Sequence, residues 1–175
     1  MIYIETPRIY IRDWKRDDLK SFISLNEDPQ VMQYFLKTLT PVESIAQFNK
    51  MKDEISNYGY GVFALERKED HAFLGFTGFH NITFNVDFAP AVEICWRLHA
   101  EYWNQGYVTE AAKACLDFAQ KNYDFDEVYA FTSLPNKSSE RVMRKIGMIK
   151  VKEFDHPEVP ENHLLKRHIL YKYSL

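Results

Sequence analysis

The segment with the clearest chemical potential runs from residue 91 to residue 112, where a strand pattern passes through a loop into a helix pattern. Apolar and polar residues alternate along 91–98, so the two faces of the expected strand differ in chemistry. The apolar face consists of Val92, Ile94, Trp96 and Leu98, and the other face of Glu93, Cys95, Arg97 and His99. A carboxylate and a thiol therefore share one face of one strand.

The loop after this strand is the second candidate feature. The first N–H groups of a helix lack partners within the helix and lie at the positive end of its dipole, an arrangement that suits a phosphate or pyrophosphate. The expected anion site is formed by Gln105, Gly106, Tyr107, Val108 and Thr109. A tight turn without any ligand would give the same pattern. Neither the Walker pattern nor GxGxxG occurs, which argues against a P-loop nucleotidase and a dinucleotide-binding enzyme.

The rest of the chain supplies the elements that must position these groups. A capping box at Thr40 to Glu43, with Pro41 at the first helical position, predicts a helix, and Asp28-Pro29 predicts a shorter one at 31–35. Asn136 is the expected cap of a later helix that Gly147 ends. Strands are predicted at 9–11, 62–66, 73–80, 91–98, 128–134, 148–154 and 167–173, with further helices after residues 18 and 109. With no repeat or linker, the prediction is one mixed α/β domain over residues 1–175.

Bulk composition narrows the class of protein. The chain of 175 residues is 46% hydrophobic and 27% charged, which is typical of a globular domain. A net charge of -3 gives no general attraction for nucleic acid or for a membrane surface. The two cysteines, Cys95 and Cys115, form no zinc-type pattern, so no metal is expected. No leader and no run of about 20 apolar residues is visible, which predicts a cytoplasmic protein.

Four segments, in chain order, resemble the GNAT superfamily of N-acetyltransferases, on the branch of the ribosomal-protein N-terminal acetyltransferases (RimJ/RimL-like). They are residues 6–12 with 28–32, residues 92–94, residues 103–112 and residues 136–148. In the family pattern Gln/Arg-x-x-Gly-x-Gly/Ala, the three marked positions are occupied by Trp103, Gly106 and Val108. Trp103 in place of Gln/Arg is common on this branch, whereas Val108 in place of Gly/Ala is a departure that adds bulk beside the expected phosphates.

The resemblance implies a mixed, mostly antiparallel central sheet flanked by helices, with a cofactor cleft where the strands at Trp96 and Val128 splay apart. It implies that acetyl-CoA is the cosubstrate and that the backbone of Trp96 and Leu98 binds its pantetheine arm like an added strand. It places Asn136 near the thioester and Ser139 where it could donate a proton to the departing thiolate. Asn136 as a plain helix cap and Ser139 as a small packing residue stay open as alternatives.

The same resemblance makes Glu93 the expected acceptor of the ammonium proton, directly or through water, or the group that holds the ammonium by charge. A tyrosine acid seven residues after Asn136 is excluded, because that position is Met143. His156, before a proline, is expected to fix a loop rather than to transfer protons. Direct attack by the amine is preferred, since neither cysteine has a histidine beside it in the sequence.

The expected function is therefore transfer of acetyl from acetyl-CoA to a primary amine, either a protein N-terminal α-amine or a small-molecule amine, by a monomer or homodimer. Two alternative functions stay open. One is a non-catalytic acyl-CoA sensor, and the other is a detoxifying acetyltransferase for aminoglycosides or polyamines. The sequence alone does not identify the acceptor.

Overall fold

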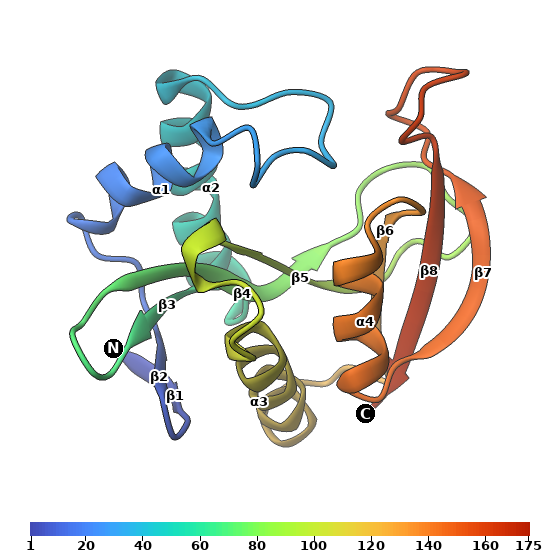
Figure 1. Cartoon of the computed structure of the whole chain (residues 1–175). Coiled ribbons are helices and arrows are strands. Elements are labelled where there is room, and N and C mark those ends of the chain that lie inside the picture. The colour runs from blue at the N-terminus through green and yellow to red at the C-terminus, as the bar shows by residue number, and fades with distance from the viewer.

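Eight strands form one open sheet in the order β1-β2-β3-β4-β5-β6-β8-β7, as the computed structural model of residues 1–175 shows (Figure 1). All neighbouring strands are antiparallel except β5 and β6, which are parallel. The strands are β1 (Ile2–Glu5), β2 (Ile9–Arg12), β3 (Val62–Arg67), β4 (Phe73–Asn81), β5 (Val92–Leu98), β6 (Glu127–Ser133), β7 (Ile149–Asp155) and β8 (Arg167–Ser174). This is the mixed, mostly antiparallel sheet that the sequence predicted.

Four helices flank the sheet, two on each face. They are α1 (Asp18–Glu27), α2 (Pro41–Tyr58), α3 (Tyr107–Asn122) and α4 (Lys137–Lys145), and a 3-10 turn, η1 (Ala100–Tyr102), precedes α3. One core cluster packs α1 and α2 against β3 and β4, and a second packs α3 and α4 against the opposite face. No helix combines the length and the apolar character needed to cross a membrane.

Local sequence signals account for several of these element ends. The Thr40 side chain accepts from the Glu43 N–H while Glu43 bonds back to the Thr40 N–H, so α2 begins at the predicted capping box. Gly147 adopts the expected left-handed conformation after α4, with φ of 90°. The predicted helix at 31–35 is wrong. The Asp28 side chain bonds to the Gln30 N–H in a local turn, and the chain then runs through isolated turns to α2.

The strand that carries the candidate chemistry is paired unevenly. β5 pairs with β4 along its whole length, from Val92 opposite Asn81 to Leu98 opposite Gly75. Its pairing with β6 is limited to Val92 with Val128 and Glu93 with Tyr129. Beyond Glu93 the two strands separate, so the backbone groups of Ile94–Leu98 that point toward β6 have no strand partner. The predicted splay is confirmed at this point.

A buried ion network ties α1 to the sheet beneath it. Arg12 makes two 2.8 Å bonds to the Asp18 carboxylate and a 2.5 Å bond to Glu66, and all three residues are at most 5% exposed. Replacing Arg12 with methionine should lower the free energy of unfolding by about 3–5 kcal/mol, because the buried Asp18 carboxylate loses its only charged partner, whereas Glu66 keeps two others. Urea denaturation measures this change in the free energy of unfolding. A matched change of the exposed Lys113, which pairs with Asp117 on α3, should have little effect; equal losses for both variants would contradict the assignment.

Candidate active site

The loop before α3 has the geometry of an anion site. Gly106 caps the helix in the left-handed conformation, with φ of 80°, and the first intrahelical bond runs from the Glu110 N–H to the Gly106 carbonyl. The N–H groups of residues 107–109 therefore have no acceptor within α3. A shallow, open groove of about 580 Å³ begins at Gly106 and runs along the exposed side of α3, and its lining includes Lys113 and Lys145. The same lining also holds three carboxylates, so the unpaired N–H groups, rather than the net charge of the groove, fit a ligand that carries phosphates.

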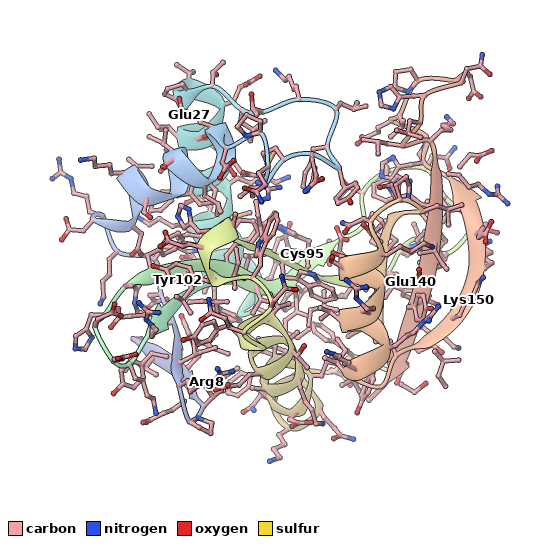
Figure 2. All side chains as sticks on the ribbon, in the orientation of Figure 1. Arg8, Glu27, Cys95, Tyr102, Glu140 and Lys150 are labelled. Atoms are coloured by element: carbon pink, nitrogen blue, oxygen red, sulfur yellow. The ribbon has the colours of Figure 1, made fainter.

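Arg8 holds this loop in place from the turn between β1 and β2. Its Nη1 donates to the Gln105 carbonyl at 2.9 Å, its Nε donates to Glu110 at 2.7 Å, and its guanidinium lies over the Tyr107 ring. Figure 2 shows Arg8 beside α3. Tyr107 is only 7% exposed, so the phenol packs in the core and only its backbone remains for a ligand.

Trp96, Asn136 and Ser139 lie together across the splay between β5 and β6. The Trp96 indole N–H donates to the Ser139 hydroxyl at 3.2 Å, which leaves the hydroxyl proton of Ser139 free to donate elsewhere. Asn136 caps α4 by accepting from the Ser139 N–H at 3.3 Å, and its amide donates to Thr132 at 3.0 Å. The structure therefore shows the cap role of Asn136, and its amide retains one further N–H.

Glu93 stands in a cluster of ionisable groups that the register of β4 and β5 brings together. His80 lies directly opposite Glu93, and Gly78 lies opposite Cys95. The side chains of His80, Glu93 and Cys95 therefore share the face of the sheet that α2 covers. Glu54 of α2 lies 2.7 Å from His80 Nδ1, although this oxygen makes no aligned hydrogen bond. Figure 2 shows Cys95 in the middle of the molecule, between the α1–α2 layer and α4.

The cluster sets the proton affinities of its members. Burial raises the pKa of Glu93 to about 7, against the charge of His80, which lowers it. Burial lowers the pKa of His80, but the Cys95 and Glu54 side chains outweigh this effect and raise it to about 11. His80 therefore holds its proton more strongly than a free imidazole does, and Glu93 exchanges its proton in the neutral range, as a general base should.

One argument from sequence needs correction. Cys95 has no histidine beside it in the sequence, yet pairing of β4 with β5 brings His80 near enough for the thiol to affect its pKa. Strand pairing joins residues that are 15 positions apart, which no local motif reveals. The absence of a neighbouring histidine therefore does not argue against Cys95 as a nucleophile. Cys115 of α3 is fully buried.

The other residues considered from sequence have structural roles. Met143 is 1% exposed, and Tyr171, at 2%, bonds to Glu140 and Arg144. His156 accepts from the Glu158 N–H at 3.2 Å, so it fixes its loop as expected, but as an acceptor. His, Cys, Asp and Glu side chains nowhere gather in a group of three that could hold a metal ion.

Comparisons with known proteins place this geometry in a family. Residues 8–149 match the acetyltransferase (GNAT) domain. The chain is 32% identical over 146 residues to the uncharacterized protein YkkB of Bacillus subtilis, covering 82% of this chain and 83% of YkkB. It is 28% identical over 148 residues to the uncharacterized N-acetyltransferase YnaD of the same species, covering 84% and 82%.

Solved structures agree on the fold. A GNAT-family acetyltransferase from Bacillus anthracis superposes with a TM-score of 0.81 at 24% identity, covering 99% of this chain and 98% of the other. RimL, a ribosomal L7/L12 α-N-protein acetyltransferase solved with coenzyme A, gives 0.82 at 13% identity, covering 100% and 98%. The chain belongs to the GNAT acetyltransferase family and is an acetyl-CoA-dependent acyltransferase.

Proposed function

We propose that this chain acetylates a primary amine by direct attack on the thioester of acetyl-CoA, with Glu93 accepting the ammonium proton directly or through one water. The observation that carries this proposal is the position of Glu93, whose pKa of about 7 suits a base. Glu93 is also the last β5 residue paired with β6, at the point where the cleft opens.

Each part of the site has one task in this proposal. The N–H groups at residues 105–109 bind the pyrophosphate, and the edge of β5 at Trp96 and Leu98, which has no strand partner, binds the pantetheine arm. The Leu98 carbonyl already accepts from the Trp103 indole N–H at 3.0 Å, so the Trp96 backbone is the main site for the arm. The Ser139 hydroxyl, which already accepts from Trp96, donates its proton to the leaving sulfur and is reprotonated by the second proton that the attacking nitrogen loses as the amide forms. Glu93 removes a proton from the ammonium, so the amine attacks as a neutral nucleophile. As part of this proposal, the likeness to RimL supports assigning the chain to a branch near the ribosomal-protein acetyltransferases.

The direct test is release of free thiol from acetyl-CoA in the presence of a panel of primary amines. Turnover with at least one amine, and none without, is the expected result. Thermal stabilisation by acetyl-CoA with no thiol release for any amine would instead identify an acyl-CoA sensor. A panel in which only polyamines or aminoglycosides react would identify a detoxifying enzyme.

Alanine at Ser139 should lower kcat by about tenfold or more while CoA binding changes little, because the hydroxyl acts on the leaving group. Alanine at Asn136 should lower kcat as well and also cost about 1 kcal/mol of stability through loss of the cap. Ser138→Ala, a change at the exposed neighbouring serine, is the control. Normal turnover in the Ser139 and Asn136 variants with saturating substrates would leave both residues with structural roles only.

Replacing Cys95 with serine should leave kcat within about twofold of the parent, because direct attack uses no enzyme nucleophile. Steady-state kinetics and the intact mass of enzyme incubated with acetyl-CoA measure this, with Cys115→Ala as the matched control. A large loss of activity at Cys95 alone, together with an acetyl group on the parent protein, would show an acyl-enzyme route with His80 as the base.

A further inference from the structure

Arg97 occupies the same face of β5 as Glu93 and Cys95, beyond the point where β5 leaves β6. Its cross-strand neighbour is Phe76 of β4, and the guanidinium carbon lies 5.2 Å from the centre of that ring. Phe35, from the segment between α1 and α2, lies 4.4 Å from the guanidinium on another side and is itself 47% exposed. Arg97 therefore borders the cleft, packed against two aromatic rings.

Arg97 uses only one of its guanidinium nitrogens, Nη1, as a hydrogen-bond donor. Nη1 donates to Asn26 Oδ1 at 2.5 Å, and Nε is shielded from solvent without any acceptor. Asn26 is fully buried and its amide donates to Ser44 and Gln47, so α2 fixes the oxygen that faces Arg97. The edge formed by Nε and Nη2 is left without a partner. This edge has the geometry that binds a carboxylate through two parallel bonds.

No carboxylate of this chain compensates the charge of Arg97. Arg12, the only arginine among the buried residues, pairs with Asp18 and Glu66, whereas the polar partner of Arg97 is a neutral amide. Burial lowers the pKa of Arg97 to about 10. A half-buried cation without a counter-ion in the chain is a favourable place for an anion that comes from outside.

The two faces of β5 separate the candidate sources of that anion. The phosphates of the cofactor belong at the start of α3, and Trp96 reaches α4, on the opposite side of the sheet from α1 and α2. Arg97 and Glu93 both lie on the α1–α2 side, four residues apart, which is about 13 Å between Cα atoms along a strand. An acceptor that contacts both side chains must span the distance that remains between their ends.

We propose that the acceptor is a small amine that also bears a carboxylate, an amino acid in its chemistry, whose carboxylate binds the Nε and Nη2 edge of Arg97 while its amine lies at Glu93. This inference rests on the proposed amine acetylation and adds the substrate class. A guanidinium in the acceptor site repels polyamines, so the same residue disfavours them as substrates.

The test compares acceptors that differ only in the carboxylate: alanine against ethylamine, and lysine against cadaverine. The parent enzyme should favour the carboxylate-bearing member by about ten- to a hundredfold in kcat/KM. Arg97→Met should remove that preference, chiefly through the KM of the amino acid, with little change for ethylamine. Asn26→Asp, which gives Arg97 a carboxylate partner within the chain, should also reduce the preference while Arg97 is retained. Thermal melting confirms that both variants fold.

A binding measurement separates failure of this inference from failure of the proposed function. With CoA present, N-acetylalanine should stabilise the parent protein against heat more than N-ethylacetamide does, and Arg97→Met should abolish the difference. If no amine reacts but this difference is found, acetylation of amines is wrong and the carboxylate site stands. Equal use of both members of each pair, or equal stabilisation by the two amides, would overturn the inference.

Discussion

Replacing Glu93 with glutamine is expected to lower the acetylation rate by roughly ten- to a thousandfold near pH 7. The variant keeps the shape of the side chain and removes its ability to accept a proton. An alkylammonium has a pKa near 10, so almost none of the acceptor is neutral at this pH without a base. The loss should shrink at high pH, where bulk hydroxide deprotonates more of the amine.

The pH–rate profile tests the role of Glu93 as a base more directly than the rate at a single pH. Burial raises the pKa of Glu93 to about 7, so the base is protonated and inactive below that value, and kcat/KM of the parent should rise as the pH rises through it. The glutamine variant should lack this limb. His80→Gln removes the cation that lowers the pKa of Glu93, so the limb should move to higher pH in that variant.

Two other results are informative for Glu93. A higher KM for the amine with kcat nearly unchanged would show that the carboxylate only holds the ammonium by charge. Profiles of the glutamine variant that overlay the parent in both parameters would remove Glu93 from the reaction and leave it an ordinary strand residue.

Replacing Gly106 with valine is expected to remove most of the affinity for CoA, about ten- to a hundredfold. The cause is conformational, since a Cβ here would meet only the end of the Arg8 side chain, at 3.4 Å. With φ at 80°, a β-branched residue is strongly disfavoured, so the loop must change and its N–H groups turn away from the phosphates. Isothermal titration with CoA measures the loss.

Gly59 provides a matched control for this change. It has φ of 74° at the end of α2, with nothing within 4 Å of its Cβ position, and it lies outside the cofactor loop. Gly59→Val imposes the same backbone strain without touching the site, so CoA affinity should be retained. Gly106→Asn, which tolerates the left-handed conformation, should bind better than the valine variant. Full affinity in Gly106→Val would exclude the loop from the cofactor site.

The sequence predicted the features of this protein that depend on local patterns. Alternation placed Glu93 and Trp96 on opposite faces of β5, and the Thr40 box and Gly147 marked helix ends, because caps act within a few residues. The residues that pair across the sheet could not be predicted from the sequence. The cluster of Glu54, His80 and Cys95 depends on the register between β4 and β5 and on α2 above it, and no motif encodes that register. At 31–35 the prediction failed for a different reason: a local signal for a helix start is present, but the chain forms turns and not a helix.

The two-residue pairing between β5 and β6 gives the sheet an exposed edge in its interior. Unpaired strand edges usually invite another chain to add a strand, and most proteins blunt theirs with charge or with short strands at the rim. Here the edge lies between β5 and β6, inside the sheet and not at its rim, and the hydrogen bond from Trp96 to Ser139 of α4 crosses the opening. An unpaired edge in that position suits a ligand with the shape of a single strand better than it suits the rim of a second sheet.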